Sequence, residues 1–269
     1  MNIERKGLLE GKQIVVMGLL DTKSLAFAIG ERAKEEGAKV IYTVQNRRFR
    51  DGLLTRSFEE VGLDIKDYHI LTCNVKKDTE VAELISQIEA PIDGLLYSIA
   101  YASPRSCLQK TLFGAPREDI LEALDISAVG FVKVAEAAKD KFIAGSSLVA
   151  MTFDSEHTYP SYSWMGIAKS TLEGISRRLA RDLGPAGVRV NCLSAGPQHT
   201  KAADMIPGFK VMEETWPERA PLGWNLDKDR EAVADSSIYL LSNLSRKVTG
   251  TIHIVDGGFH SVGIADPKE

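Results

Sequence analysis

The sequence predicts an α/β protein in which one doubly wound parallel sheet spans a single domain, residues 1–269. Three observations predict it. Seven short apolar, β-branched segments alternate with longer amphipathic ones, as strands alternate with helices in such sheets. No repeat, low-complexity tract or Pro/Gly-rich linker divides the chain of 269 residues. Hydrophobic residues make up 44% of the chain and charged residues 26%, which is typical of an ordinary globular protein.

The seven strands are expected at 13–18, 39–44, 68–73, 94–99, 147–152, 188–194 and 251–255. They are apolar nearly throughout rather than at alternate positions, which indicates strands that are covered on both faces. Helices are expected in the gaps, at 24–36, 79–88, 117–142, 161–183 and 229–243. In the first helix Leu25, Ala28, Ile29 and Ala33 recur on one face. Right-handed crossovers between the strands then give a Rossmann-like sheet of seven parallel strands flanked by helices.

Residues 196–228 interrupt this alternation between the sixth strand and the last helix. The segment holds four prolines, but also Met205, Ile206, Phe209, Met212, Trp216 and Trp224. A long connection inside a compact domain is usually functional or disordered, and this apolar content argues against disorder. We expect an ordered lid with an apolar underside above an apolar ligand. The alternative is a surface excursion that packs on a neighbouring subunit.

Several classes of function are disfavoured by composition. The formal net charge of −4 gives no electrostatic case for nucleic-acid binding. The longest apolar runs, such as Ile14–Leu20, are too short to cross a bilayer, and the N-terminal residues form no secretory segment. Three widely spaced cysteines and the absence of a cluster with metal-ligand spacing predict no disulfide framework and no metal site. The expected compartment is the reducing cytoplasm.

The end of the first strand carries a weak dinucleotide signal. Gly18 would let the backbone approach a pyrophosphate, and Ser24 could cap the following helix or bind a phosphate oxygen. The full GxGxxG pattern is absent. After the second strand, Gln45 could bind the ribose, whereas Arg47 or Arg48 could reach a 2′-phosphate. This favours NADH, with NADPH as the alternative.

The ends of the third and fourth strands complete this picture. Cys73-Asn74-Val75 follows one strand, and Asn74 could accept a hydrogen bond from an adenine amino group. The small residues within 98–102 would let a flat cofactor lie on the backbone. Both segments fall at carboxyl ends of strands, where open α/β sheets bind ligands.

After the fifth strand, Tyr162 and Lys169 stand seven residues apart. In a helix that spacing brings them within about 20° on one face. A phenol near an ammonium can donate a hydrogen bond to a developing oxyanion, and the lysine can bind the nicotinamide ribose. The alternative interpretation is a buried amphipathic helix with an incidental lysine.

These motifs together resemble the short-chain dehydrogenase/reductase superfamily, and within it the NADH-dependent enoyl-acyl-carrier-protein reductases. Ordinary superfamily members use Tyr-x3-Lys, but Met165 stands four residues before Lys169, so this chain has the Tyr-x6-Lys spacing of enoyl reductases. The nine-residue offset from Phe153 to Tyr162 is similar to that of the mycobacterial-type enzymes. The resemblance spans about residues 8–263 and also rests on Gly18 with Ser24-Leu-Ala, Ser98-Ile-Ala-Tyr-Ala, Asp125-Ile-Ser127, Ala195-Gly-Pro197 and Val255-Asp-Gly-Gly-Phe259.

The resemblance implies the last step of the fatty-acid elongation cycle, in which NADH reduces a trans-2-enoyl thioester of acyl carrier protein. Tyr162 would stabilise the enolate oxygen, Lys169 would bind the nicotinamide ribose, and Phe153 would wall the substrate. The other cofactor-binding residues would be Gly18, Ser24, Leu25, Gln45, Asn74, Val75, Ser98, Ile99, Ala100, Ala195, Gly196, Pro197, Gln198 and Thr200. The other substrate-binding residues would be Tyr101, Ala102, Met165, Ala202, Met205 and Ile206. A homotetramer is implied, as is a basic entrance for acidic acyl carrier protein, with Lys201, Lys210 and Arg219 as candidates.

Departures from the family pattern keep alternatives open. The family usually has Asp where this chain has Asn74, although an amide can still accept a hydrogen bond from adenine. Gln198 places a polar side chain after Pro197, where the family usually has an apolar one, and Lys201 adds a charge to the first turn of the lid. A buried polar group without a partner costs free energy, so both side chains must find partners or face water. The alternative functions are a carbonyl- or alcohol-oxidising dehydrogenase and a catalytically silent NAD(P)-binding module.

Overall fold

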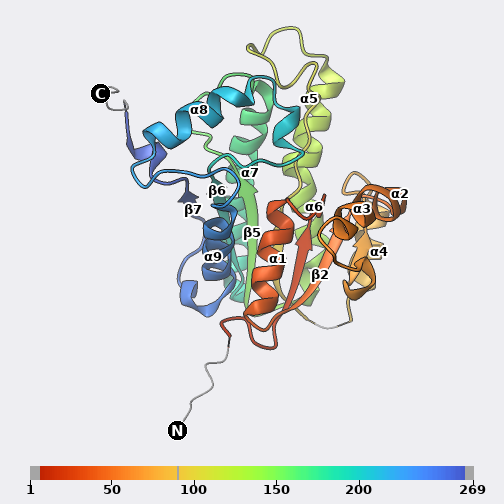
Figure 1. The fold of residues 1–269 in the computed structure, drawn as a ribbon. Coiled ribbons are helices and arrows are strands. Elements are labelled where there is room, and N and C mark those ends of the chain that lie inside the picture. The colour runs from red at the N-terminus through yellow and green to blue at the C-terminus, as the bar shows by residue number, and fades with distance from the viewer. Residues whose placement is uncertain (1–6, 90, 264–269) are drawn as a thin grey trace.

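Seven parallel strands form one sheet in the computed structural model, which describes residues 7–89 and 91–263 (Figure 1). The sheet order is β3-β2-β1-β4-β5-β6-β7, and every neighbouring pair is parallel. The strands are β1 (Gln13–Met17), β2 (Lys39–Val44), β3 (Ile70–Thr72), β4 (Ile92–Tyr97), β5 (Phe142–Thr152), β6 (Arg189–Ala195) and β7 (Ile252–Val255). The strand order reverses between β1 and β4, where sheets of this type bind ligands. The predicted fold class is confirmed; of the predicted domain, residues 1–6, 90 and 264–269 lie outside the described residues.

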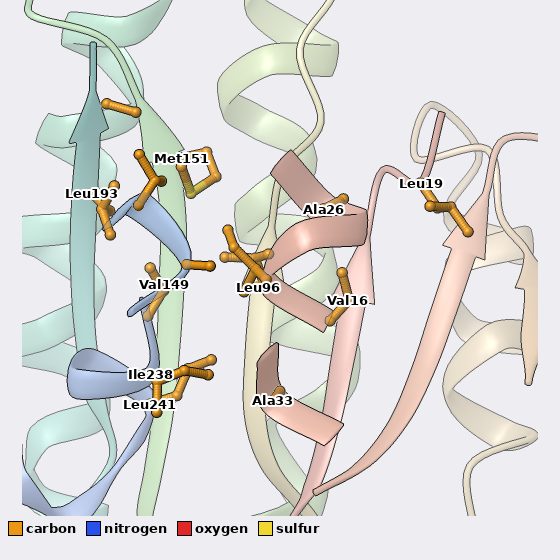
Figure 2. Packing of buried hydrophobic residues seen from close by; sticks show 14 of the residues in the cluster. Val16, Leu19, Ala26, Ala33, Leu96, Val149, Met151, Leu193, Ile238 and Leu241 are labelled. Atoms are coloured by element: carbon orange, nitrogen blue, oxygen red, sulfur yellow. The ribbon is translucent and has the colours of Figure 1, made fainter. Parts of the chain in front are cut away.

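Helices cover both faces of this sheet. On one face α1 (Leu25–Glu35) and α9 (Arg230–Leu241) pack side by side. Figure 2 shows Ala26 and Ala33 of α1 facing the strand residues Val16 and Leu96, with α9 beside them. The opposite face buries a second apolar cluster beneath α4 (Asp78–Ser86), α6 (Gly130–Ala138) and α7 (Ser163–Leu183). The near-continuous apolar strands are explained by this double burial.

The single helix predicted over 117–142 is in fact interrupted. It consists of α5 (Arg117–Leu124), a wider π-helical turn (Asp125–Val129) and α6, and β5 begins at Phe142, five residues earlier than predicted. In the wide turn the carbonyl of Ile126 accepts a 2.6 Å hydrogen bond from the Tyr97 hydroxyl of β4. Such π-helical turns cannot be distinguished from regular helix by apolar spacing alone.

One helical region between two strands was missed, and the start of one helix was misplaced. Between β2 and β3 lie α2 (Arg47–Phe49), a π-helical turn (Arg50–Leu54) and α3 (Thr55–Glu59), whose charged residues obscure the pattern. The prediction also placed Tyr162 inside a helix from residue 161. Instead α7 begins at Ser163, because Ser161 adopts a left-handed conformation (φ +58°) and Tyr162 is the N-cap residue.

The segment 196–228 is ordered and contains α8 (Phe209–Arg219), which Figure 1 places at the upper end of the molecule. The predicted apolar underside is confirmed at Met212, Trp216 and Trp224, which are buried, whereas Met205 is 56% exposed. The Trp216 ring stacks on Phe259 with 3.7 Å between ring centroids, and its indole N–H donates to the Asp256 carbonyl oxygen at 3.1 Å. These aromatic contacts fix the segment to the body of the domain. That it covers a substrate remains a prediction.

Candidate active site

A cavity of about 700 Å³ opens at the carboxyl ends of the first four strands, beside the start of the lid. This volume lies within the ordinary range of small-molecule sites. Most residues predicted to hold the cofactor line it. They are Gly18, Ser24, Leu25, Gln45, Asn74, Val75, Ser98, Ile99, Ala100 and Thr200, and the predicted substrate residues Tyr101, Ala202 and Met205 line it as well.

Gly18 lets two strands approach closely at the floor of this cavity. Its φ is +96°, and a Cβ there would stand 2.4 Å from the carbonyl oxygen of Ser98. Its N–H donates to the Thr43 carbonyl oxygen at 3.2 Å, and Leu19 N–H donates to the same oxygen at 2.9 Å. No other residue type fits this conformation and contact without displacing the neighbouring strand. The cavity floor is therefore bare backbone that a flat ligand can approach.

Ser24 caps α1 at the wall of the cavity. Its hydroxyl accepts from the N–H of Phe27 at 3.3 Å and donates to the Asp21 carbonyl oxygen at 2.6 Å. The first N–H groups of a helix have no partner within the helix, and with the helix dipole they favour anions. A bare glycine floor beside a capped helix N-terminus fits the pyrophosphate of a dinucleotide, so the described residues fit the cofactor that the sequence implies.

The end of β2 shapes the far end of the cavity. Gln45 lines it, and Asn46 caps α2 by accepting from the N–H of Phe49 at 2.9 Å. Arg47 and Arg48 are exposed on α2 and do not line the cavity. Phe49 does line it and was missed by sequence reasoning, because nothing in the local pattern shows that a one-turn helix would bring it back to the cavity.

An ion pair borders the cavity where β3 ends. Asn74 uses its side-chain oxygen to accept from the N–H of Lys76 at 3.2 Å, and its own N–H donates to Glu80 at 2.9 Å. The Lys76 ammonium pairs with Glu122 of α5 at 2.6 Å, and both side chains line the cavity. The pair joins residues 46 positions apart, so no local sequence signal predicts it.

Tyr162 lies outside the lining of this cavity, against Phe153. The two rings meet edge to face with 5.2 Å between centroids, and Phe153 also contacts Trp216 of the lid at 5.7 Å. Among the described residues the Tyr162 hydroxyl has no hydrogen-bond partner. Burial raises the pKa of this phenol, because the phenolate would lose its hydration. The Tyr162 phenol is therefore neutral and can donate a hydrogen bond to a ligand.

Lys169 ties α7 to the end of β5. Its side chain is 6% exposed, and its ammonium donates to the Met151 carbonyl oxygen at 2.8 Å. Burial lowers its pKa to about 8, although Cys192 and Glu173 oppose that shift. One turn further on, buried Glu173 accepts hydrogen bonds from the hydroxyls of Thr152 at 2.8 Å and Ser155 at 2.5 Å. The segment that carries Phe153 is thus anchored on both sides by α7.

The remaining predicted residues fall into two groups that do not line the cavity. Three predicted substrate residues, Ala102, Met165 and Ile206, pack in one apolar cluster that Tyr162 also joins. Ala195, Gly196, Pro197 and Gln198 are buried at the end of β6. Gln198 is 6% exposed, and neither atom of its amide has a partner among the described residues.

Among the described residues, no group of three or more histidine, cysteine or carboxylate side chains could hold a metal ion. The same residues contain no helix with the length and apolarity needed to span a membrane.

Comparison with known proteins gives full-length matches. A family model described as enoyl-(acyl carrier protein) reductase matches residues 18–260. The NADH enoyl-[acyl-carrier-protein] reductase of Mycolicibacterium smegmatis is 35% identical, with 94% of this chain and 97% of that protein covered. The corresponding protein of Mycobacterium avium is 36% identical over the same shares, and the NADPH enzyme of Staphylococcus aureus is 37% identical, with 94% and 98% covered. On these matches and on its doubly wound sheet, the chain belongs to the enoyl-acyl-carrier-protein reductase family.

Proposed function

We propose that the protein reduces trans-2-enoyl thioesters of acyl carrier protein to saturated acyl thioesters with NADH, with Tyr162 and Lys169 as its catalytic pair. The observation that carries this assignment is the Tyr162 phenol, which lies beside Phe153 with no hydrogen-bond partner among the described residues. Relatives along the whole chain bear the name of that activity.

When bound, the dinucleotide would supply a hydride for the β-carbon of the enoyl group. Electron density then moves to the thioester oxygen, and the α-carbon later takes a proton from water. Tyr162 donates its hydrogen bond to that oxygen and stabilises the negative charge where it develops. Lys169 holds the nicotinamide ribose, and the Phe153 ring limits access of water to the reacting atoms.

Cofactor choice follows from the end of β2. Gln45 lines the cavity and can bind a ribose hydroxyl. A 2′-phosphate would need an arginine in the cavity lining, but Arg47 and Arg48 both lie outside it. We therefore propose NADH as the preferred cofactor and NADPH as a poorer one. The names of relatives include both cofactors, so the family alone does not decide.

The partners follow from charge and exposed apolar surface. Arg219 is half-buried, with its guanidinium 4.3 Å over the Phe259 ring. Lys201 and Lys210 are more exposed, so they are the better candidates for the basic entrance that acidic acyl carrier protein would meet. Exposed Leu121 and Ile167 on α5 and α7 fit burial in a homotetramer. The three cysteines are free, as the reducing cytoplasm would keep them.

The experiment is oxidation of NADH and of NADPH, in parallel, with a medium-chain trans-2-enoyl-CoA in place of the carrier-protein thioester. We expect turnover with NADH and a loss of about 10²–10³ in Tyr162→Phe, as for removal of one oxyanion donor. Tyr239→Phe is the matched control, because that half-buried tyrosine on α9 packs on His253 instead.

Unchanged turnover in Tyr162→Phe would refute the role of the phenol. Activity on ketones but not on enoyl thioesters would instead favour the carbonyl-reducing alternative. Tight NADH binding without turnover, even on the carrier-protein substrate, would favour the silent module.

A further inference from the structure

Lys201, in the first turn of the lid, reaches across to the loop that precedes α1. Its ammonium lies 3.5 Å from a carboxylate oxygen of Asp21, a residue 180 positions earlier in the chain. Asp21 is 2% exposed, whereas the Lys201 side chain is 49% exposed and lines the cavity. A buried acid is therefore paired with a lysine that is open to ligands.

Asp21 also builds the turn that presents the start of α1. Its second carboxylate oxygen accepts from the N–H of Lys23 at 3.0 Å, and its carbonyl oxygen accepts from the N–H and the hydroxyl of Ser24. The carboxylate is thus fixed in the loop that leads from Gly18 to the start of α1. An anion bound at that helix terminus would meet the negative charge of Asp21 unless a cation compensates it.

Lys201 is the cation placed to do so. Among the described residues that line the cavity, three are charged, namely Lys76, Glu122 and Lys201. Lys76 and Glu122 form an ion pair at 2.6 Å, so their opposite charges nearly cancel each other. The acid that holds Lys201 does not itself line the cavity. The remaining charged lining residue, Lys201, is positive and stands beside the loop before α1.

We propose that Lys201 binds the phosphates of the dinucleotide and that Asp21 holds it in position to do so. The inference rests on the proposed function in one respect, since it requires that the cavity bind a dinucleotide. Through this contact the first turn of the lid and the loop before α1 would hold the same ligand. Binding of the cofactor would then also fix the lid.

The test is equilibrium binding rather than turnover. The dissociation constants of ADP-ribose, which carries the pyrophosphate, and of adenosine, which lacks it, are measured by calorimetry for wild type and Lys201→Met. We expect Lys201→Met to weaken ADP-ribose binding about tenfold at low salt and to change adenosine binding less than twofold. Because the contact is half-exposed, the tenfold difference should shrink as salt is raised.

Three further variants isolate the effect of the Lys201 charge. Lys201→Arg keeps the cation and should bind ADP-ribose within about threefold of wild type. Lys133→Met removes a lysine of similar exposure (41%) that lies 3.5 Å from Asp78 but outside the cavity, and this variant should bind ADP-ribose as wild type does. Adding Asp21→Asn to Lys201→Met should recover much of the lost affinity, because the uncompensated carboxylate is then gone.

The outcomes separate the two proposals. Equal ADP-ribose affinity in wild type and Lys201→Met would overturn the phosphate role and leave the dinucleotide site standing. Equal losses for ADP-ribose and adenosine would overturn it too, since the substitution would then have damaged the cavity generally. If wild type bound neither ADP-ribose nor NADH, the proposed function itself would fall, and this inference with it.

Discussion

Replacing Gln198 by methionine should stabilise the protein in the absence of ligand. The side chain is 6% exposed, and both polar atoms of its amide lack a hydrogen-bond partner among the described residues. Protein mutational data put the cost of burying such a group at about 1–3 kcal/mol. Methionine has a similar unbranched shape, fills the same space and carries no amide. We therefore expect the free energy of unfolding to rise by about 1–2 kcal/mol.

The assay is thermal and urea unfolding of the ligand-free protein. For a chain of this size each kcal/mol shifts Tm by about 2–4 °C, so the expected rise in Tm is about 2–8 °C. Gln109→Met is the matched control. That half-buried amide donates to the Pro104 carbonyl oxygen at 2.7 Å, so the same substitution there should lower stability by about 1 kcal/mol.

A fall in Tm for Gln198→Met, or no change, would refute this reasoning, because the amide must then be satisfied by water in solution. Saturating NADH provides a second comparison. If the amide pairs with the ligand, NADH will raise Tm less in Gln198→Met than in wild type, since ligand stabilisation follows affinity.

Two further predictions concern the cavity floor and Lys169, the lysine of the proposed catalytic pair. Gly18→Ala places a methyl group 2.4 Å from the Ser98 carbonyl oxygen at a φ of +96°. We therefore expect a lower Tm and, by fluorescence titration, at least tenfold weaker NADH binding. Wild-type values for both would contradict the close approach of the two strands at Gly18. Burial lowers the pKa of Lys169 in the folded protein to about 8 from its ordinary 10.5. Between these two pH values the unfolded chain binds more protons than the folded protein. The free energy of unfolding therefore rises with pH over this range, by about 2–3 kcal/mol. In urea unfolding from pH 7.5 to 10.5 this rise should be absent from Lys169→Met, and parallel curves for the two proteins would refute the low pKa.

The sheet and the location of the site were predictable because both follow from local patterns. Apolar strands and turn residues at their ends fix which residues meet at the carboxyl edge, so Gly18, Gln45, Asn74 and Ser98 all line one cavity. The start of α7 was predicted wrongly because apolar spacing does not reveal the left-handed Ser161. The short helix α2 was missed because its residues are mostly charged.

What sequence could not provide is contact between distant side chains. Gln198 and Lys201 stand out as departures from the family pattern, yet nothing local shows that one amide is buried alone or that the other side chain meets Asp21. Both facts depend on how the lid packs, and this in turn depends on Trp216 and Trp224. Tertiary packing therefore decides whether a residue that departs from the family pattern is left without a hydrogen-bond partner, as Gln198 is among the described residues, or forms an ion pair, as Lys201 does.

Burial acts in opposite directions on the pKa values of Tyr162 and Lys169, the proposed catalytic pair. Burial raises the pKa of Tyr162 and lowers that of Lys169 to about 8. A tyrosine that exchanges a proton with a carbonyl substrate needs a pKa lowered toward neutrality by a nearby cation. A tyrosine that only donates a hydrogen bond to an enolate oxygen needs to stay protonated at all working pH values. A phenol that burial keeps protonated therefore suits the hydrogen bond to an enolate oxygen that we propose for Tyr162.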